Sequence, residues 1–166
     1  MFFDVKKPPA LCLAKLVCFD ESIKLFSQSS SLTDQIKNLC ATDFRFKIIK
    51  NSSGALSDPP LPYKPFAQTG IIRDVYLCCG HQKLIYARSF LPLSSLKGYW
   101  RCLQSLKRPL GTVLFHHRYV KREFLGFYSV AYPKACLGRF LRFHLPTGPI
   151  LVTEWVALKK DLSTPY

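Results

Sequence analysis

The sequence predicts an α+β fold, a single domain in which short helices pack on one face of a mostly antiparallel sheet of about six strands. Strand-like segments follow one another closely from residue 70 onward, near enough in the chain to pair antiparallel. The helix-like segments between and before them are short. With 166 residues, 48% of them hydrophobic and 14% aromatic, the chain suits one folded domain over 1–166 and is too apolar for a disordered one.

The first elements come before residue 51. Two short helices are expected between Phe19 and Ala41, the first capped by Asp20 and the second by Ser31, where SLTD resembles a capping box. FRFKIIK at 44–50 reads as a strand. The stretch 51–65 has four prolines and a Ser/Gly cluster, which predicts a loop inside the domain.

The remaining elements give the fold its β character. IIRDVYLCC and KLIYARSFL flank GHQ and predict a hairpin, and PTG predicts a second hairpin between the last two strands. Residues 93–107 read as a helix, and RPLGTVLF as a turn followed by a short helical or extended piece. The expected strands after residue 70 are 71–79, 83–91, 120–130, 136–145 and 149–158.

The chain is strongly basic. It has 24 Lys and Arg against 10 Asp and Glu, a formal charge of +14, which favours an anionic partner: nucleic acid, a membrane surface or an acidic substrate. The basic residues never run longer than two, unlike a nucleic-acid-binding tail. No uncharged stretch approaches a membrane span, and the charged, proline-containing start MFFDVKKPPALCLAK is a poor signal peptide. We therefore expect a cytoplasmic protein without stable membrane insertion.

The cysteines and histidines do not predict a metal site. The seven cysteines include no CxxC pair. Cys78-Cys79 and His116-His117 are adjacent pairs, and adjacent residues of a strand point to opposite faces. We expect reduced cysteines packed as small apolar residues, and no metal.

Three charged residues fall on strand faces that are otherwise apolar. Strand alternation places Arg73, Arg88 and Glu154 on such faces, provided that no bulge intervenes. One interpretation is a solvent-facing surface or a structural Arg73–Glu154 ion pair. The other is an enclosed pocket, where arginines hold a carboxylate and Glu154 handles a hydroxyl or a proton. Helix starts at SLT and RPLG would add backbone N–H donors, or serve only as ordinary caps.

The order and spacing of several motifs resemble those of the chorismate lyase family. The resemblance extends from about residue 26 to residue 166, and any one motif alone is weak. The motifs are SLT (31–33), IIRDVYL (71–77), ARSFLP (87–92), LKRPLGTVLF (106–115), KREF (121–124) and PILVTEW (149–155).

The resemblance implies an enzyme that converts chorismate to 4-hydroxybenzoate and pyruvate, the entry step to ubiquinone in many bacteria. It implies a monomer without metal or organic cofactor, with a closed pocket beneath helical flaps. The family's binding arginine maps to Arg73 and its binding glutamate to Glu154, while backbone contacts map to Leu32 and Leu110. A second family arginine maps to Arg88.

Two positions depart from the family pattern. Leu32 stands where Met can occur, which a backbone contact would tolerate, and Ala87 stands where Gly can occur. Residues 42–66 and the first 24 match poorly, so no role is transferred to them.

We expect Arg73, with the amides of Leu32 and Leu110, to hold the ring carboxylate. Glu154 is expected near the hydroxyl, as hydrogen-bond partner or proton shuttle, and Arg88 is expected to bind the pyruvyl carboxylate or stabilise charge as the ether breaks. Arg73, Arg88 and Glu154 are thus the predicted catalytic residues. No Ser/His/Asp triad is needed, because aromatisation drives the elimination.

Two alternatives belong to other functional classes. A non-catalytic sensor-like module would bind a small aromatic acid without turnover, but such modules usually follow a helix-turn-helix domain and only two short helices precede this sheet. A nucleic-acid-binding protein would explain the +14 charge and the 13 Phe, 8 Tyr and 2 Trp, although most of these aromatics fall in strand patterns typical of a core. The enzyme is the favoured interpretation.

Overall fold

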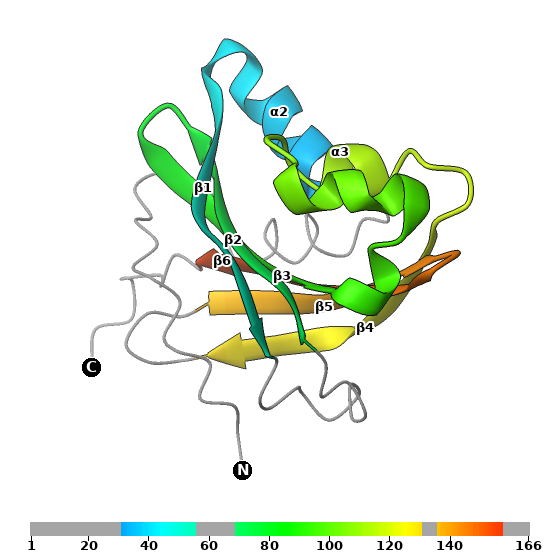
Figure 1. Ribbon diagram of the computed structural model, residues 1–166. Helices are drawn as coiled ribbons and strands as arrows, with labels where there is room; N and C mark the ends of the chain where they lie inside the picture. The colour runs from blue at the N-terminus through cyan, green and yellow to red at the C-terminus, as the bar shows by residue number, and fades with distance from the viewer. Residues whose placement is uncertain (1–30, 56–68, 131–135, 158–166) are drawn as a thin grey trace, which may run out of the picture.

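Six antiparallel strands form one sheet in the order β1-β2-β3-β6-β5-β4. A computed structural model describes residues 31–55, 69–130 and 136–157 (Figure 1). This architecture confirms the predicted α+β class. The strands are β1 (Phe44–Ala55), β2 (Thr69–Cys79), β3 (Gln82–Pro92), β4 (Lys121–Val130), β5 (Cys136–Leu145) and β6 (Gly148–Ala157).

The helices of the described part of the chain are short and lie on one side of the curved sheet (Figure 1). None of them is long and apolar enough to cross a membrane. They are α2 (Leu32–Cys40), η1 (Ala41–Asp43), η3 (Leu93–Ser95), η4 (Gly98–Ser105) and α3 (Gly111–Leu114), where η marks a 3-10 helix.

The start of α2 is the one that the sequence predicted. The Ser31 hydroxyl accepts a hydrogen bond from the amide of Asp34 at 3.4 Å, as an N-cap does. The other half of a capping box would turn the Asp34 carboxylate back toward Ser31, but Asp34 instead contacts His116.

Two apolar clusters attach the helices to the sheet. Near one end of the sheet, Leu32, Ile36 and Cys40 of α2 pack with Leu77 and Val156 among others. Toward the other end, η4 and α3 pack on strands β3, β5 and β6. Buried members of this second cluster include Trp100, Leu103, Leu114, Leu141, Phe143 and Ile150. The helical layer therefore has two anchorage points.

Strand β1 is longer than predicted. The expected loop began at residue 51, yet residues 51–55 continue the strand and pair with Thr69 to Arg73 of β2. Backbone pairing at the edge of a sheet needs no apolar side chain, so the Ser/Gly composition did not end the strand. The rest of the expected loop, 56–65, and the helix expected after Asp20 lie outside the described residues.

The single helix expected over 93–107 is wrong, because the segment forms η3 and η4 separately. Lys97 is extended, and Gly98 has a φ of 54°, a left-handed conformation that interrupts a helix and suits glycine. The Ser95 hydroxyl donates to the carbonyl of Pro149 at 2.8 Å, which fixes η3 on the last hairpin. In RPLGTVLF the helical alternative is the one observed, as α3.

Both predicted hairpins are present, and the sheet has three irregularities. The register shifts between Ile48 and Lys50, between Leu77 and Cys78, and between Phe124 and Gly126. The first shift lies opposite Asp74 and Val75, but its extra residue is in β1. No extra residue lies in β2 between Arg73 and Leu77 or in the paired part of β6, so strand alternation holds around Arg73 and Glu154.

Candidate functional site

A cavity lies between the helical layer and the middle of the sheet. Its space, counted together with its opening to solvent, is about 360 Å³. Residues of β2, β3 and β6 line it from the sheet, and the starts of α2 and α3 line it from above. The lining residues are Thr33, Arg73, Val75, Leu77, Ala87, Ser89, Pro109, Leu110, Gly111, Val152 and Glu154.

Strand register brings the two predicted charged residues to this cavity. Arg73 of β2 pairs with Ser89 of β3. Two residues away on β3, and on the same face, Ala87 pairs with Glu154 of β6. Arg73 and Glu154 therefore face the same cavity from the two strands that flank β3, 81 positions apart in the chain.

Arg73 is a buried cation with unused donors. Its side chain is only 1% exposed, and burial lowers the pKa of its guanidinium, although an arginine stays charged in proteins. Nη2 donates to the carbonyl of Arg108 at 2.9 Å, and the guanidinium lies 5.5 Å over the ring of Phe46. Nε and Nη1 have no hydrogen-bond partner among the described residues. This arrangement suits an anionic ligand.

Glu154 is paired with an arginine that the sequence analysis did not single out. Arg139 of β5 is its direct cross-strand neighbour, and Arg139 Nε donates to Glu154 Oε2 at 2.5 Å. The two side chains are 2% and 10% exposed. The expected structural alternative, an Arg73–Glu154 ion pair, is not what the described residues show.

A signal for Arg139 was present in the sequence. Alternation in CLGRFLRFHL places Arg139 on one face with Leu137, Leu141 and Phe143, all buried. The criterion that selected Arg73 and Glu154, a charged residue on an otherwise apolar strand face, would have selected Arg139 as well.

The two predicted backbone contacts lie at the starts of the helices. Leu110 lines the cavity immediately before α3, and Leu32, fully buried, is the first residue of α2 beside the lining residue Thr33. The first amides of a helix have no intrahelical partner. A Cβ on Gly111 would lie 2.9 Å from Thr33 Oγ1, so a glycine permits the two starts to approach.

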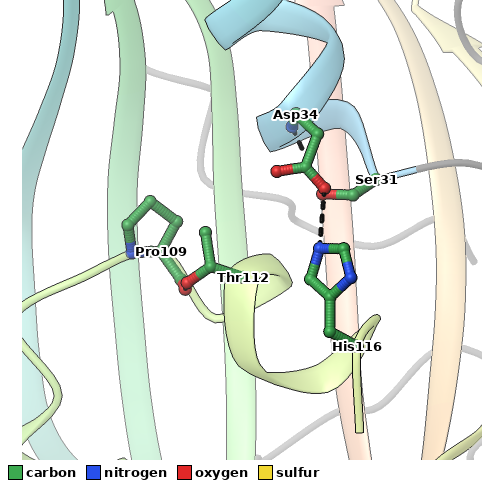
Figure 2. A network of polar contacts seen from close by, with 5 residues as sticks. All are labelled: Ser31, Asp34, Pro109, Thr112 and His116. Atoms are coloured by element: carbon green, nitrogen blue, oxygen red, sulfur yellow. Dashed lines mark hydrogen bonds and ion pairs between the residues drawn. The ribbon is translucent and has the colours of Figure 1, made fainter.

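One polar contact joins the two segments, and another lies within the turn that begins α3 (Figure 2). Nε2 of His116, two residues beyond α3, lies 3.1 Å from Asp34 Oδ2 on α2. The Thr112 hydroxyl donates to the carbonyl of Pro109 at 2.7 Å within the turn that begins α3. The cover of the cavity is therefore formed by two segments that a side-chain contact joins.

Arg88 is not brought to the cavity. It lies one residue from the lining positions Ala87 and Ser89, hence on the opposite face of the sheet. Its Nε and Nη2 donate to the two carboxylate oxygens of Asp74, both at 2.8 Å, and this hydrogen bonding raises the pKa of Arg88. Asp74, which the sequence analysis did not single out, is buried.

A small apolar cavity with a buried arginine at one side and a buried carboxylate at the other defines an α+β domain with a site suited to a small organic acid. The chain belongs to the chorismate lyase family, whose sequence model matches residues 20–161.

Curated relatives agree with this membership. A probable chorismate pyruvate-lyase of Nitrosospira multiformis is 34% identical over 142 residues, which cover 75% of this chain and 79% of that protein. A probable chorismate pyruvate-lyase of Methylococcus capsulatus is 35% identical over 99 residues, 58% of this chain and 61% of the relative. The chorismate pyruvate-lyase of Escherichia coli K12 is 32% identical over 95 residues, 57% of this chain and 56% of the relative.

Among solved structures, the C-terminal domain of the histidine utilization repressor from Pseudomonas syringae has a similar fold. The TM-score is 0.53, and the match covers 74% of this chain and 98% of that domain at 8% sequence identity. Identity this low relates the folds alone.

Proposed function

We propose that the protein is a lyase that eliminates pyruvate from chorismate and releases 4-hydroxybenzoate. The observation that supports this most strongly is that Arg73 and Glu154 line the same cavity, at positions that match the family motifs. Arg73 has hydrogen-bond donors without a partner among the described residues. The curated relatives are named for this reaction.

The cavity suggests how the ring would be held. The ring carboxylate would contact Arg73 and the amides near Leu32 and Leu110, while the hydroxyl would face Glu154. The apolar side chains between them would contact the ring faces and exclude water from it. These apolar lining residues are Val75, Leu77, Ala87 and Val152.

The proposed reaction needs positioning more than a strong nucleophile. The bond from the ring carbon to the ether oxygen breaks, and the neighbouring carbon, which bears the hydroxyl, loses its hydrogen as a proton. The electrons of that C–H bond complete the aromatic ring, and the released enolpyruvate takes up a proton to become pyruvate. Glu154 is the side chain we assign to accept the hydroxyl's hydrogen bond and to receive the ring proton.

We assign Arg88 to the stability of the sheet rather than to the pyruvyl carboxylate, because its guanidinium fork is occupied by Asp74 on the far face. We further propose that the chain acts as a cytoplasmic monomer, without metal or organic cofactor, at the entry to ubiquinone synthesis. The basic charge would attract the dianionic substrate.

The test is product analysis after mixing purified protein with chorismate, with E154Q as the comparison. Equimolar 4-hydroxybenzoate and pyruvate, formed much more slowly by E154Q, are expected. A wild-type rate in E154Q would exclude proton transfer by Glu154. Tight binding of 4-hydroxybenzoate without turnover would favour the sensor-like alternative, and neither binding nor turnover would contradict the proposal.

A further inference from the structure

The ion pair between Arg139 and Glu154 is the buried charge pair that borders the cavity. Arg139 emerges from β5 between Leu137 and Leu141, both buried, and directs Nε to one oxygen of Glu154 at 2.5 Å. Glu154 also lines the cavity, whereas Arg139 lies behind it and is not among the lining residues. Arg139 is therefore placed to act on a ligand through Glu154 rather than by lining the cavity itself.

We propose that Arg139 is a positioning residue that holds Glu154 as an ionised, acceptor-only carboxylate and thereby sets the orientation and selectivity of ligand binding. The proposal rests on the proposed function, in which a hydroxyl of the ligand faces Glu154. It adds a residue and a selection rule: the cavity accepts an acid with a hydroxyl opposite its carboxylate, and rejects a second carboxylate there.

The stability of the sheet does not explain why this pair is charged. A buried ion pair adds little net stability relative to apolar side chains of similar volume, because desolvation of both charges offsets their attraction. Its neighbours on the same face of β5 are apolar, so the position would accommodate an apolar pair. What the pair adds is charge and a fixed geometry at the wall of the cavity.

The other groups around Glu154 agree with an ionised carboxylate. Arg73 faces the same cavity from β2, and the lowered pKa of Arg122 on β4 reflects burial and then the charge of Arg139, partly opposed by Glu154. The neighbour on β3 is Ala87, and the lining residues of α2 and α3 are uncharged. Among the cavity-lining residues, Glu154 is the single acid.

An ionised carboxylate discriminates between ligand groups by sign. It accepts a hydrogen bond from a hydroxyl, a charge-assisted bond that is stronger than one between neutral groups. It repels a carboxylate, and in a low-dielectric cavity that repulsion is large. The ligand's own carboxylate is therefore directed to Arg73 and its hydroxyl to Glu154.

The test compares the dissociation constants of 4-hydroxybenzoate and terephthalate, which carries a second carboxylate in place of the hydroxyl. R139Q removes the charge but keeps a hydrogen-bond donor, and R139K keeps the charge. R142Q is the matched control, because Arg142 lies on the same strand and pairs at 3.1 Å with Glu123, whose side chain is 43% exposed.

Wild type and R142Q are expected to prefer 4-hydroxybenzoate at least tenfold. R139Q should lose most of that preference at pH 7, while R139K should stay within about threefold of wild type. A structural role alone would affect R139K and R139Q alike.

A wild-type preference retained by folded R139Q, checked by circular dichroism, would overturn the inference. So would equal binding of terephthalate and 4-hydroxybenzoate by the wild-type protein, a measurement that needs no variant. Chorismate turnover by wild type, measured alongside, separates this failure from failure of the proposed function, which would show neither turnover nor 4-hydroxybenzoate binding.

Discussion

His116 and Asp34, 82 residues apart in the chain, meet above the cavity with Nε2 of the imidazole 3.1 Å from Oδ2 of the carboxylate (Figure 2). The contact joins the first turn of α2 to the residues just after α3. Both segments line the cavity at their starts, through Thr33 and Gly111. Both segments therefore form part of the wall of the cavity.

The close approach of the two segments makes Gly111 a sensitive position. In G111A the new methyl group would lie 2.9 Å from Thr33 Oγ1 and 3.1 Å from Ser31 Oγ, so the Thr33 side chain or the segment that carries it must shift. We expect kcat/KM for chorismate to fall by about 10- to 100-fold, because small displacements of positioning groups are costly. The control is G80N in the β2–β3 turn, where a Cβ meets nothing within 4 Å and Asn tolerates the φ of 56°. Equal activities of G111A and wild type would show that this approach does not shape the site.

The His116–Asp34 contact itself should contribute little. The two side chains are 67% and 35% exposed, and exposed ion pairs contribute roughly 0.2–1 kcal/mol. H116Q should therefore lower the free energy of unfolding in urea by no more than about 1 kcal/mol and change kcat by less than about threefold. H144Q, which breaks a surface contact to Glu123 of 2.8 Å, is the comparison. A tenfold change in kcat confined to H116Q would instead identify a latch that governs opening.

The fold class and the faces of Arg73 and Glu154 could be predicted, because strand alternation is a local property of the chain. The alternation held at both residues since the bulges fall elsewhere. The division of residues 93–107 into η3 and η4 could not be predicted. It depends on the left-handed conformation of Gly98 and on the hydrogen bond from Ser95 to the last hairpin, which is a tertiary contact.

Pair partners were the least predictable part of the site. The arrangement depends on β3 pairing with β6, a connection between strands that are far apart in sequence. That order separates Arg73 from Glu154, because β3 lies between their strands. Arg139 reaches Glu154 through the register of the β5–β6 hairpin. Likewise, Arg88 stands on an apolar face as predicted, but the register places Asp74 opposite it.

Arg88 provides a test of sheet stability. R88M would leave the Asp74 carboxylate, 8% exposed, without its two hydrogen bonds, whereas Arg88 itself is 37% exposed and partly screened. We expect the free energy of unfolding to fall by about 2 kcal/mol, with KM for chorismate nearly unchanged. The double variant R88M/D74L should recover part of the loss, because it removes the stranded charge. A large rise in KM with unchanged stability would instead indicate that Arg88 binds the substrate.

Cys40, at the end of α2, predicts a pH effect on stability. Burial, and then hydrogen bonding to Cys79, raises the pKa of its thiol to about 12. In the unfolded chain a thiol titrates near 8.5, so above that pH the unfolded state loses its proton first and becomes favoured. The thiol's contribution to the free energy of unfolding is therefore fully present below about pH 8.5. It decreases as the pH rises toward 12, by up to ~1.4 kcal/mol per pH unit.

Urea unfolding at several pH values between 8 and 10.5 measures this effect. C40A should show a shallower loss of stability with pH than wild type, whatever its stability at pH 8. The exposed Cys102 supplies the control variant, C102A, whose pH dependence should match that of wild type. Identical slopes in all three proteins would mean that Cys40 ionises in the folded state as readily as in the unfolded one.

Arg73 and Arg139 should respond oppositely to removal of their charge. Arg73 has a single hydrogen bond, to the carbonyl of Arg108, and no carboxylate partner among the described residues, so its burial is uncompensated until a ligand binds. R73M should raise the free energy of unfolding by ~1 kcal/mol or more and weaken 4-hydroxybenzoate binding by about 100-fold. R139M should instead destabilise the protein by roughly 3–5 kcal/mol, because it strands the Glu154 charge. R45M, at an exposed position of β1, controls for the loss of a positive charge. If R73M proved as destabilising as R139M, Arg73 would be a structural residue rather than a cation reserved for the ligand.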